Sequence, residues 1–236
     1  MPIKTSVILC SYNEANYIKN TISELEKNIQ NLELVIVDDN STDGTKEIIN
    51  QLNHDNRIKI IFRKKSKGLA SAFLRGIVET TGDYIGWLDT NMGEFAPRFK
   101  EMSDILSSNN DIVILSRYID GGGDKRNLLR VLSSKYFNIL CRLMLRPNIK
   151  DFTSSIFLMK RQVLDEVTFL GYGHGDFFIE FLHNAHKKGF IIKEIPYIQN
   201  KDDDLVKSKS APNLIKFFYL GLMYCIRILS TIIRRN

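Results

Sequence analysis

The stretch Val35-Ile36-Val37-Asp38-Asp39-Asn40-Ser41-Thr42-Asp43-Gly44-Thr45 joins a run of β-branched apolar residues to an acidic, turn-forming segment. A second stretch of this kind is Trp87-Leu88-Asp89-Thr90-Asn91. Each apolar run predicts a buried strand of a parallel sheet, which places each acidic segment at the carboxyl edge of that sheet. Open α/β folds bind ligands at this edge, so the two stretches together predict a nucleotide site.

Short β-branched runs alternate with longer amphipathic stretches through the first half of the chain. This alternation predicts an α/β fold with a doubly wound, mainly parallel sheet and flanking helices. The expected strands lie near residues 6–10, 32–37, 58–62, 84–88, 112–116 and 190–195. The expected helices lie near residues 14–28, 43–52, 69–80, 97–107, 126–146, 176–188 and 214–235, and Ser41, Thr42 and Asp43 are candidate caps of the second.

The composition is that of a soluble globular protein, with 236 residues, of which 44% are hydrophobic and 25% charged. We expect one α/β domain over residues 1–210 and an amphipathic C-terminal helix over residues 211–236. The three cysteines are scattered and odd in number, which favours a reducing compartment. No secretory signal precedes the first expected strand, and we therefore expect a cytoplasmic location.

The C-terminal helix combines apolar residues with a narrow basic stripe. Of the formal net charge of +6, residues 201–236 supply +4, from seven basic and three acidic residues. A helical projection places Lys216, Arg227, Ser230 and Arg234 on one face. This pattern is typical of a helix at an anionic membrane surface, and the alternative is a helix packed on the domain with a solvated stripe. Nucleic acid is excluded as a partner, because no stacking aromatics alternate with the basic residues.

Asp39 and Asp89 each follow a predicted strand, separated in sequence by two βα units. A nucleotide-diphosphate sugar requires contacts to its base and ribose, and a divalent ion with oxygen ligands for its diphosphate. Either carboxylate alone could instead cap a helix. The pair favours a site for a nucleotide-diphosphate sugar.

Several motifs of the chain match a known family. They are Ser11-Tyr12-Asn13-Glu14, the stretch from Val37 to Thr45, Lys67-Gly68-Leu69-Ala70, Thr81-Gly82-Asp83-Tyr84 and Leu88-Asp89-Thr90-Asn91. Together they resemble the family 2 glycosyltransferases, which have the GT-A fold. A second set of motifs resembles the dolichol-phosphate mannose synthase branch, whose acceptors are polyprenyl phosphates. These motifs are Ser116-Arg117-Tyr118, Asp151-Phe152-Thr153-Ser154-Ser155, Glu194-Ile195-Pro196 and Ser208-Lys209. The resemblance covers roughly residues 4–210.

On the donor side, the resemblance implies a set of nucleotide and diphosphate contacts: Tyr12, Glu14, Val37, Asp39, Asp89, Thr90 and Lys209. It also implies that Asp89 and Asn91 bind Mg²⁺ or Mn²⁺. Asn91 departs from the family, which usually has a second carboxylate there, so we expect weaker metal binding or help from Glu94. Alternatively, the site binds a nucleotide sugar without catalysis. Phe157 also departs, since arginine is frequent at this position.

On the acceptor side, the resemblance implies that Arg117, Arg130 and Ser134 hold the phosphate of a polyprenyl phosphate, with Asp89, Arg117 and Arg130 as the catalytic residues. Arg126, Arg130 and Ser134 recur every four residues and share one helix face, where Arg126 could instead be solvated. Arginine forks suit a phosphate monoester.

The resulting function is an inverting transferase, peripheral on the cytoplasmic membrane face, with a membrane-anchoring subunit as a further expected partner. A hydroxyl acceptor would instead require a base, for which Asp176 and Glu180 are candidates. These two carboxylates could also simply cap the helix or pair with Lys187 and Lys188 on its surface.

Overall fold

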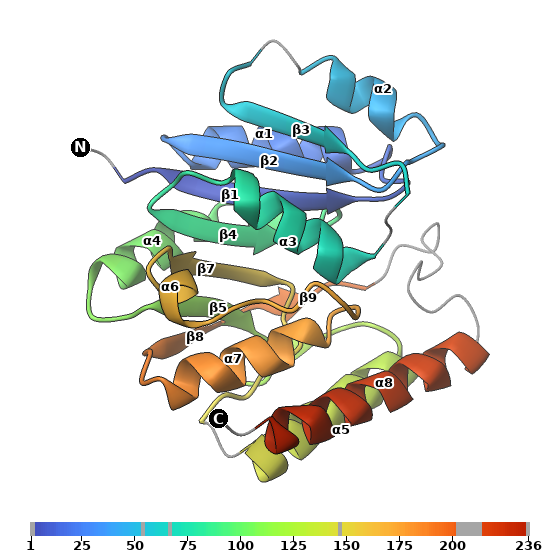
Figure 1. The fold of residues 1–236 in the computed structure, drawn as a ribbon, viewed down its shortest axis with the longest axis vertical. Coiled ribbons are helices and arrows are strands. Elements are labelled where there is room, and N and C mark those ends of the chain that lie inside the picture. The colour runs from blue at the N-terminus through green and yellow to red at the C-terminus, as the bar shows by residue number, and fades with distance from the viewer. Residues whose placement is uncertain (1–2, 53–54, 66–67, 146–147, 202–213, 235–236) are drawn as a thin grey trace.

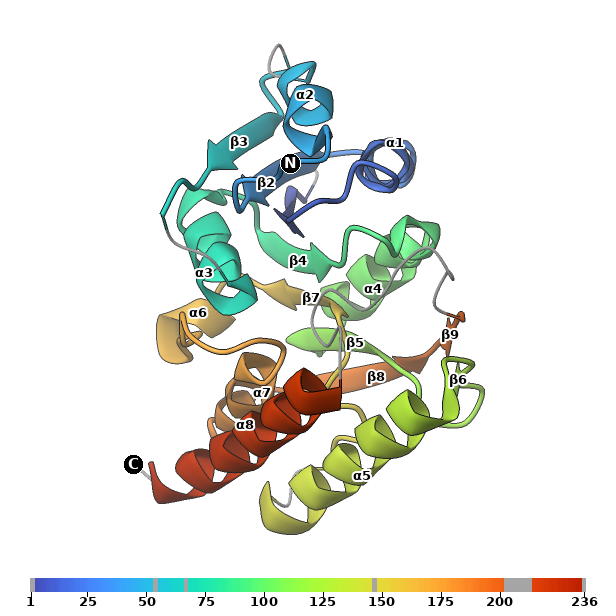
Figure 2. The ribbon, with the colours of Figure 1, turned by 90° about the vertical axis from the view of Figure 1, so that its right-hand side faces the viewer.

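The computed structural model describes residues 3–52, 55–65, 68–145, 148–201 and 214–234. A central sheet has helices on both faces (Figures 1 and 2). Its seven strands are β1 (Thr5–Ser11), β2 (Leu32–Asp38), β3 (Ile58–Phe62), β4 (Tyr84–Leu88), β5 (Ile112–Ser116), β7 (Ile156–Lys160) and β8 (Ile192–Pro196), and β6 (Gly123–Asp124) pairs separately with β9 (Ile198–Gln199). The helices are α1 (Ile18–Asn28), α2 (Thr45–Asn50), α3 (Leu69–Glu79), the 3₁₀ turn η1 (Gly93–Phe95), α4 (Arg98–Ser107), α5 (Leu128–Leu145), α6 (Val163–Glu166), α7 (Phe177–Lys187) and α8 (Leu214–Ile233).

The strand order of the sheet is β3-β2-β1-β4-β7-β5-β8. All its neighbouring strands are parallel except β7, which lies antiparallel between β4 and β5. The predicted mainly parallel α/β sheet is therefore confirmed, although β7 itself was not predicted. Phe157, in the middle of β7, is fully buried and stacks on Phe178 with ring centroids 4.7 Å apart.

Both faces of the sheet are covered by apolar layers. Along β1, Val7 and Leu9 pack with α1, α2 and α4, while Ile8 between them packs on the opposite face with α3 and α7. Strands buried on both faces require apolar residues at successive positions, which explains the continuous runs in the sequence. Because the strand interiors are buried and apolar, the polar side chains of the sheet lie at the strand ends.

The first helix begins at Ile18, four residues later than expected. Asn13, directly before the expected start, has a positive φ of 57°, and residues 15–17 form a turn instead of the first helical turn. The loop is held to the one after β2, because the N–H groups of Asn13 and Glu14 donate to the hydroxyls of Ser41 and Thr45, both at 2.8 Å. The carboxyl ends of β1 and β2 thus carry one interlocked loop pair.

Helix α8 packs on α5 and α7 (Figure 1), and Arg227 of its predicted basic stripe faces inward, whereas the Arg234 side chain is 50% exposed. Arg227 is only 4% exposed, because the buried carboxylates Asp176 and Glu180 on α7 require a cation. The exposed side of α8 is apolar instead, and the Lys216 side chain lies outside the described ones. The prediction that this stripe faces lipid was therefore wrong for Arg227.

Candidate active site

Two acidic loops flank the end of β1. In the sheet register Ser11 pairs with Asp38 on one side, and Ile8 pairs with Trp87 on the other. The chain therefore leaves the sheet at the same edge at Asp39 and at Asp89. Because β2 and β4 are two strand spacings apart, their backbones are separated by about 10 Å. The carboxyl edge of the sheet thus presents both acidic residues toward one region, as the sequence predicts.

Cys10 lies between these two carboxylates. Burial raises the pKa of its thiol far above the usual range, and the charges of Asp89 and Asp39 raise it further, while Arg63 lowers it. One side chain at the end of β1 therefore experiences both acids.

Asp39 is already engaged by the loop after β3. Its carboxylate accepts from Arg63 Nε at 2.5 Å and Nη2 at 2.7 Å, and from the N–H of Gly68 at 2.8 Å. Asp39 is 6% exposed, so this ion pair is shielded from water. Sequence reasoning missed Arg63, although its position directly after a predicted strand places it at the same sheet edge.

Asp89 has a different environment from that of Asp39. Burial raises its pKa to about 7; a hydrogen bond from Ser155 opposes this rise and the nearby Glu14 carboxylate adds to it. Within the described part of the chain, no lysine or arginine forms an ion pair with Asp89. A half-buried carboxylate with a second carboxylate nearby favours binding of a cation.

The oxygen groups around Asp89 fit a divalent ion that takes most of its ligands from substrate phosphates and water. Asn91 is exposed on the same loop and offers an amide oxygen, whereas Glu94 accepts a hydrogen bond from Asn200 at 2.8 Å. The described residues contain no group of three or more His, Cys, Asp or Glu that could hold a metal. Mg²⁺ commonly binds through one or two carboxylates plus substrate phosphates and water, which is compatible with this sparse ligand set.

The remaining predicted donor contacts differ in their surroundings. Tyr12 is 44% exposed at the edge of the site, and Glu14 lies close enough to Asp89 to affect its pKa. Val37 is fully buried in the core beside α3, so its side chain does not reach the site. Thr90 is 3% exposed and donates to the carbonyl of Cys10 at 3.1 Å, which fixes the acidic loop to β1. Lys209 lies outside the described residues.

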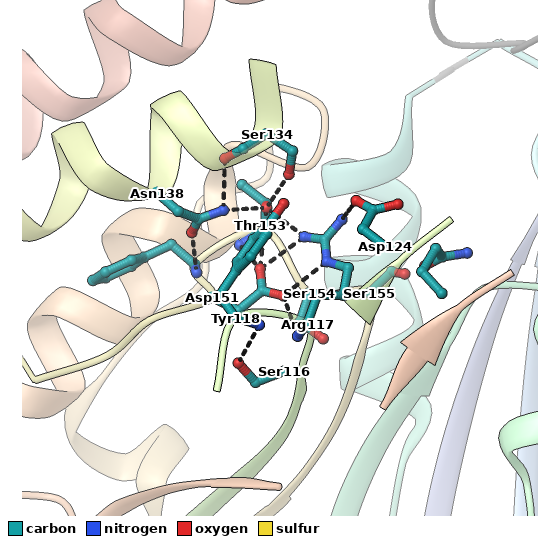
Figure 3. Close-up of polar contacts among 12 residues, drawn as sticks. Ser116, Arg117, Tyr118, Asp124, Ser134, Asn138, Asp151, Thr153, Ser154 and Ser155 are labelled. Atoms are coloured by element: carbon teal, nitrogen blue, oxygen red, sulfur yellow. Dashed lines mark hydrogen bonds and ion pairs between the residues drawn. The ribbon is translucent and has the colours of Figure 1, made fainter. Parts of the chain in front are cut away.

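Arg117, at the end of β5, is the centre of a buried network (Figure 3). Its Nε and Nη2 donate to Asp151 at 2.8 and 2.7 Å, and Nη2 also donates to Thr153 at 2.7 Å. Asp124 lies 3.6 Å from Nη1. Burial alone would lower the pKa of Arg117, but the Asp151 carboxylate holds it above its usual value. Arg117 is therefore a fixed cation whose nearest partners are protein carboxylates.

Helix α5 presents the other predicted acceptor residues. The Ser134 hydroxyl lies 3.2 Å from that of Thr153, which also binds Arg117, so Ser134 and Arg117 share a partner (Figure 3). Arg130 is partly exposed one turn earlier on the same helix. Arg126 binds Asp124 through Nε at 2.8 Å and Nη2 at 2.6 Å, so it is neither solvated nor directed at Ser134.

The segment Asp151–Ser155 links the two halves of the site. Asp151 and Thr153 hold Arg117, while Ser155 donates to Met92 Sδ at 3.2 Å and lies close enough to Asp89 to lower the pKa of that carboxyl. The backbone N–H of Asp151 donates in turn to Glu194 at 3.0 Å, which anchors the segment to β8. A displacement of this segment would therefore move the cation of Arg117 relative to the carboxylate of Asp89.

The two carboxylates considered as general bases have structural partners. Asp176 and Glu180 are 2% and 6% exposed, and they accept from Arg227 Nε at 2.8 Å and Nη1 at 3.1 Å. The alternative prediction, that Asp176 and Glu180 are surface carboxylates paired with Lys187 and Lys188, was therefore wrong. Sequence reasoning could not find this pairing, because Arg227 lies about 50 positions away in a helix with its own regular pattern.

Comparisons with known proteins agree with this fold. The family model described as Glycosyl transferase family 2 matches residues 6–168. The chain is 28% identical over 225 residues to a dolichol-phosphate mannosyltransferase of Pyrococcus furiosus, covering 92% of this chain and 63% of that protein. It is 24% identical over 220 residues to a polyprenol monophosphomannose synthase of Mycolicibacterium smegmatis, covering 89% and 83%.

The fold is also shared with a solved enzyme. Glucosyl-3-phosphoglycerate synthase from Mycobacterium tuberculosis, in complex with uridine diphosphate, superposes with a TM-score of 0.74 at 15% identity, covering 100% of this chain and 82% of that one. The chain spans about 63% of the length of the Pyrococcus furiosus relative. Since the family model covers well over half of the sequence, the chain belongs to glycosyltransferase family 2.

Proposed function

We propose that this chain is an inverting glycosyltransferase that moves a sugar from a nucleotide-diphosphate sugar to a polyprenyl phosphate. The main support is the segment Asp151–Ser155, in which Asp151 binds Arg117 and Ser155 lies close enough to Asp89 to lower its pKa, so that one segment lies between the two charged groups. The names of the two relatives, a dolichol-phosphate mannosyltransferase and a polyprenol monophosphomannose synthase, support this acceptor class and make mannose the first sugar to test.

The donor would lie across the loops after β1, β2 and β4. Asp89 and Asn91 would hold a Mg²⁺ or Mn²⁺ ion, which supplies positive charge to the departing diphosphate. Crystals of the glucosyl-3-phosphoglycerate synthase with Mn²⁺ and uridine diphosphate support this choice of cofactor. Tyr12, Glu14 and Asp39 would contact the nucleotide, and Lys209 remains a proposed diphosphate contact.

The acceptor phosphate would be bound by Arg130 and Ser134 beside the fixed charge of Arg117. A phosphate monoester is already largely ionised near neutral pH, so its oxygen can attack the anomeric carbon without a strong general base. Because Arg227 engages both Asp176 and Glu180, neither is placed to serve as such a base for a hydroxyl. This favours a phosphate acceptor over the hydroxyl alternative.

A membrane-facing surface is supported by two exposed apolar stripes on adjacent helices. None of the described helices is long and apolar enough to cross a bilayer. The apolar side chains of α5 that are 38–72% exposed are Leu128, Leu129, Leu132, Tyr136, Ile139 and Leu143. Those of α8 that are 47–80% exposed are Tyr219, Leu222, Ile226, Leu229 and Ile233. Several exposed apolar side chains on one face of a helix typically mark a contact with lipid or protein.

We assign this apolar surface to the cytoplasmic face of an anionic membrane. The exposed cations Lys135 and Arg142 on α5 would attract lipid phosphates beside the apolar stripe. Residues 211–236 would then be the membrane-interface part of the molecule and residues 1–210 its catalytic domain. A membrane-anchoring subunit is the other partner that this surface could accept.

The function is tested by incubating the protein and a divalent ion with radiolabelled nucleotide sugars and short polyprenyl phosphates. We expect label to enter the lipid. Arg130→Ala should lower kcat/KM for the lipid roughly 10- to 100-fold, the effect of a lost charge-assisted hydrogen bond, and leave nucleotide binding unchanged. The matched control is Arg75→Ala, an exposed arginine of α3 paired with Glu79.

Two outcomes would overturn the proposal. Binding of a nucleotide sugar without transfer to any acceptor would identify a non-catalytic binding protein. Transfer to sugar hydroxyls that is insensitive to Arg130→Ala would identify the hydroxyl-acceptor alternative.

A further inference from the structure

The buried face of α1 contains one polar side chain. Ile18, Ile22 and Leu25 on this face are at most 2% exposed, and Thr21 among them is 1% exposed. The helical spacing of this face would accept a valine of the same shape in place of Thr21. A hydroxyl buried among apolar residues is destabilising unless it is hydrogen-bonded. The Thr21 hydroxyl has its partner on a distant segment, because it donates to the carbonyl of Thr90 at 2.6 Å.

Thr90 is thereby held from two sides. Its own hydroxyl donates to the carbonyl of Cys10 on β1 at 3.1 Å, so both its side chain and its carbonyl are fixed. The Thr90 carbonyl belongs to the planar peptide group that leads to Asn91. The two hydrogen bonds therefore fix the direction in which the chain passes from Asp89 to Asn91.

The loop after β4 also approaches the backbone of α1 closely. A Cβ atom placed on Gly93 would be 2.6 Å from Thr21 Oγ1 and 2.8 Å from Thr21 Cα, which is too close for any side chain. Glycine at this position is therefore required for the observed approach. The hydroxyl of Thr21 and the absence of a side chain at Gly93 together set the distance between the loop and α1.

We propose that Thr21 is a positioning residue for the divalent ion, because its hydroxyl holds the Thr90–Asn91 peptide in place. The inference rests on the proposed function, in which Asp89 and Asn91 bind this ion. An amide oxygen brings no charge, so its value as a ligand depends on being held in position. Loss of the hydrogen bond from α1 should lower the affinity for the ion without changing the charge of the site.

The test is calorimetric titration of UDP and GDP, using whichever the wild type binds, over a series of Mn²⁺ concentrations and in EDTA. Thr21→Val keeps the shape of the side chain and removes its hydrogen bond. It should raise the Mn²⁺ concentration that gives half-maximal nucleotide binding roughly three- to tenfold and leave binding in EDTA unchanged. Excess Mn²⁺ should restore the wild-type affinity. Thr21→Ser, which keeps the hydroxyl, should stay close to the wild type.

The matched control is Thr231→Val. Thr231 is 3% exposed, and its hydroxyl donates to the carbonyl of Arg227 at 2.8 Å, so this variant removes a similar buried hydrogen bond within α8. Its Mn²⁺ requirement should equal that of the wild type. Gly93→Ala is an independent second variant, because the added methyl group would force the loop away from Thr21, and it should raise the Mn²⁺ requirement as Thr21→Val does.

Two results would overturn the inference while leaving the proposed function intact. One is an equal Mn²⁺ requirement in the wild type and in Thr21→Val. The other is a loss of nucleotide affinity in Thr21→Val that is the same in Mn²⁺ and in EDTA, which would indicate a general structural effect. A wild type that binds neither nucleotide would overturn both the inference and the proposed function.

Discussion

The buried ion pairs of Arg227 give a sharp prediction about stability. Arg227 is 4% exposed, and its guanidinium binds two carboxylates that are themselves almost fully buried. Burial alone would lower the pKa of Arg227, but the hydrogen bonds to Asp176 and Glu180 raise it. Removing the cation with Arg227→Met would leave two buried negative charges without their main partner. We expect a loss of about 3–5 kcal/mol in the free energy of unfolding.

The assay is urea or thermal unfolding followed by circular dichroism. For a chain of this size about 1 kcal/mol corresponds to 2–4 °C, so the melting temperature should fall by roughly 10 °C. Arg234→Ala is the control, because Arg234 binds the same Glu180 at 3.2 Å with a side chain that is 50% exposed. Because this pair is exposed to solvent, Arg234→Ala should lower the melting temperature far less than Arg227→Met does.

A compensating variant separates charge from packing. Combining Arg227→Met with Asp176→Asn and Glu180→Gln removes the uncompensated charges, and should recover much of the lost stability. The reasoning would be refuted if Arg227→Met were as stable as Arg234→Ala. That result would mean that Arg227 faces water, as the basic stripe in the sequence first suggested.

Three further predictions concern titration and membrane contact. Burial raises the pKa of Asp89 to about 7, so between about pH 4 and 7 the folded chain holds a proton that the unfolded chain has released. Without metal, the free energy of unfolding should therefore fall as the pH rises from about 4 to about 7. Asp89→Asn should therefore stabilise the fold in EDTA more at roughly pH 8 than at pH 5, and an equal effect at both would contradict the assignment. Burial alone would raise the pKa of Glu33, but hydrogen bonds from neighbouring hydroxyl and N–H groups lower it to about 2. Its stabilising effect is present above about pH 4.5 and is lost as pH falls toward 2, so Glu33→Gln should destabilise the fold at pH 7 and lose this effect near pH 2; a pH-independent difference in urea unfolding would count against it. Leu132→Glu combined with Leu229→Glu should abolish sedimentation with anionic vesicles, whereas Val78→Glu, at a site 71% exposed on α3, should not, and equal binding by all three proteins would exclude the α5 and α8 surface.

Local patterns in the sequence were sufficient for most of the first half of the fold. The strands at residues 58–62, 84–88 and 112–116 were predicted with the bounds observed, because short β-branched runs between turn signals specify buried strands well. The strand β7 was missed. Its run Ile156-Phe157-Leu158-Met159-Lys160 follows the polar motif of residues 151–155 directly, and no local pattern indicates antiparallel insertion between distant strands.

The sequence predicted which residues lie at the site better than it predicted the contacts that these residues make. Asp39 and Asp89 reach the same sheet edge as expected, because carboxyl ends of parallel strands share that edge. Their surroundings were not predicted, since Arg63 reaches Asp39, and Ser155 comes near Asp89, only through the tertiary fold. The same limit explains Arg227, whose helical stripe indicated an exposed face until the buried carboxylates of α7 supplied a partner.

The central claim is that Asp39 and Asp89 bind one nucleotide, and calorimetric titration of UDP and GDP in Mn²⁺ and in EDTA tests it most directly. Asp89→Asn should weaken binding at least about tenfold in Mn²⁺ and have little effect in EDTA, because Asp89 acts through the ion. Asp39→Asn should weaken binding under both conditions, because its proposed contact is to the nucleotide itself. Nucleotide affinities that are unchanged in both variants would contradict the account.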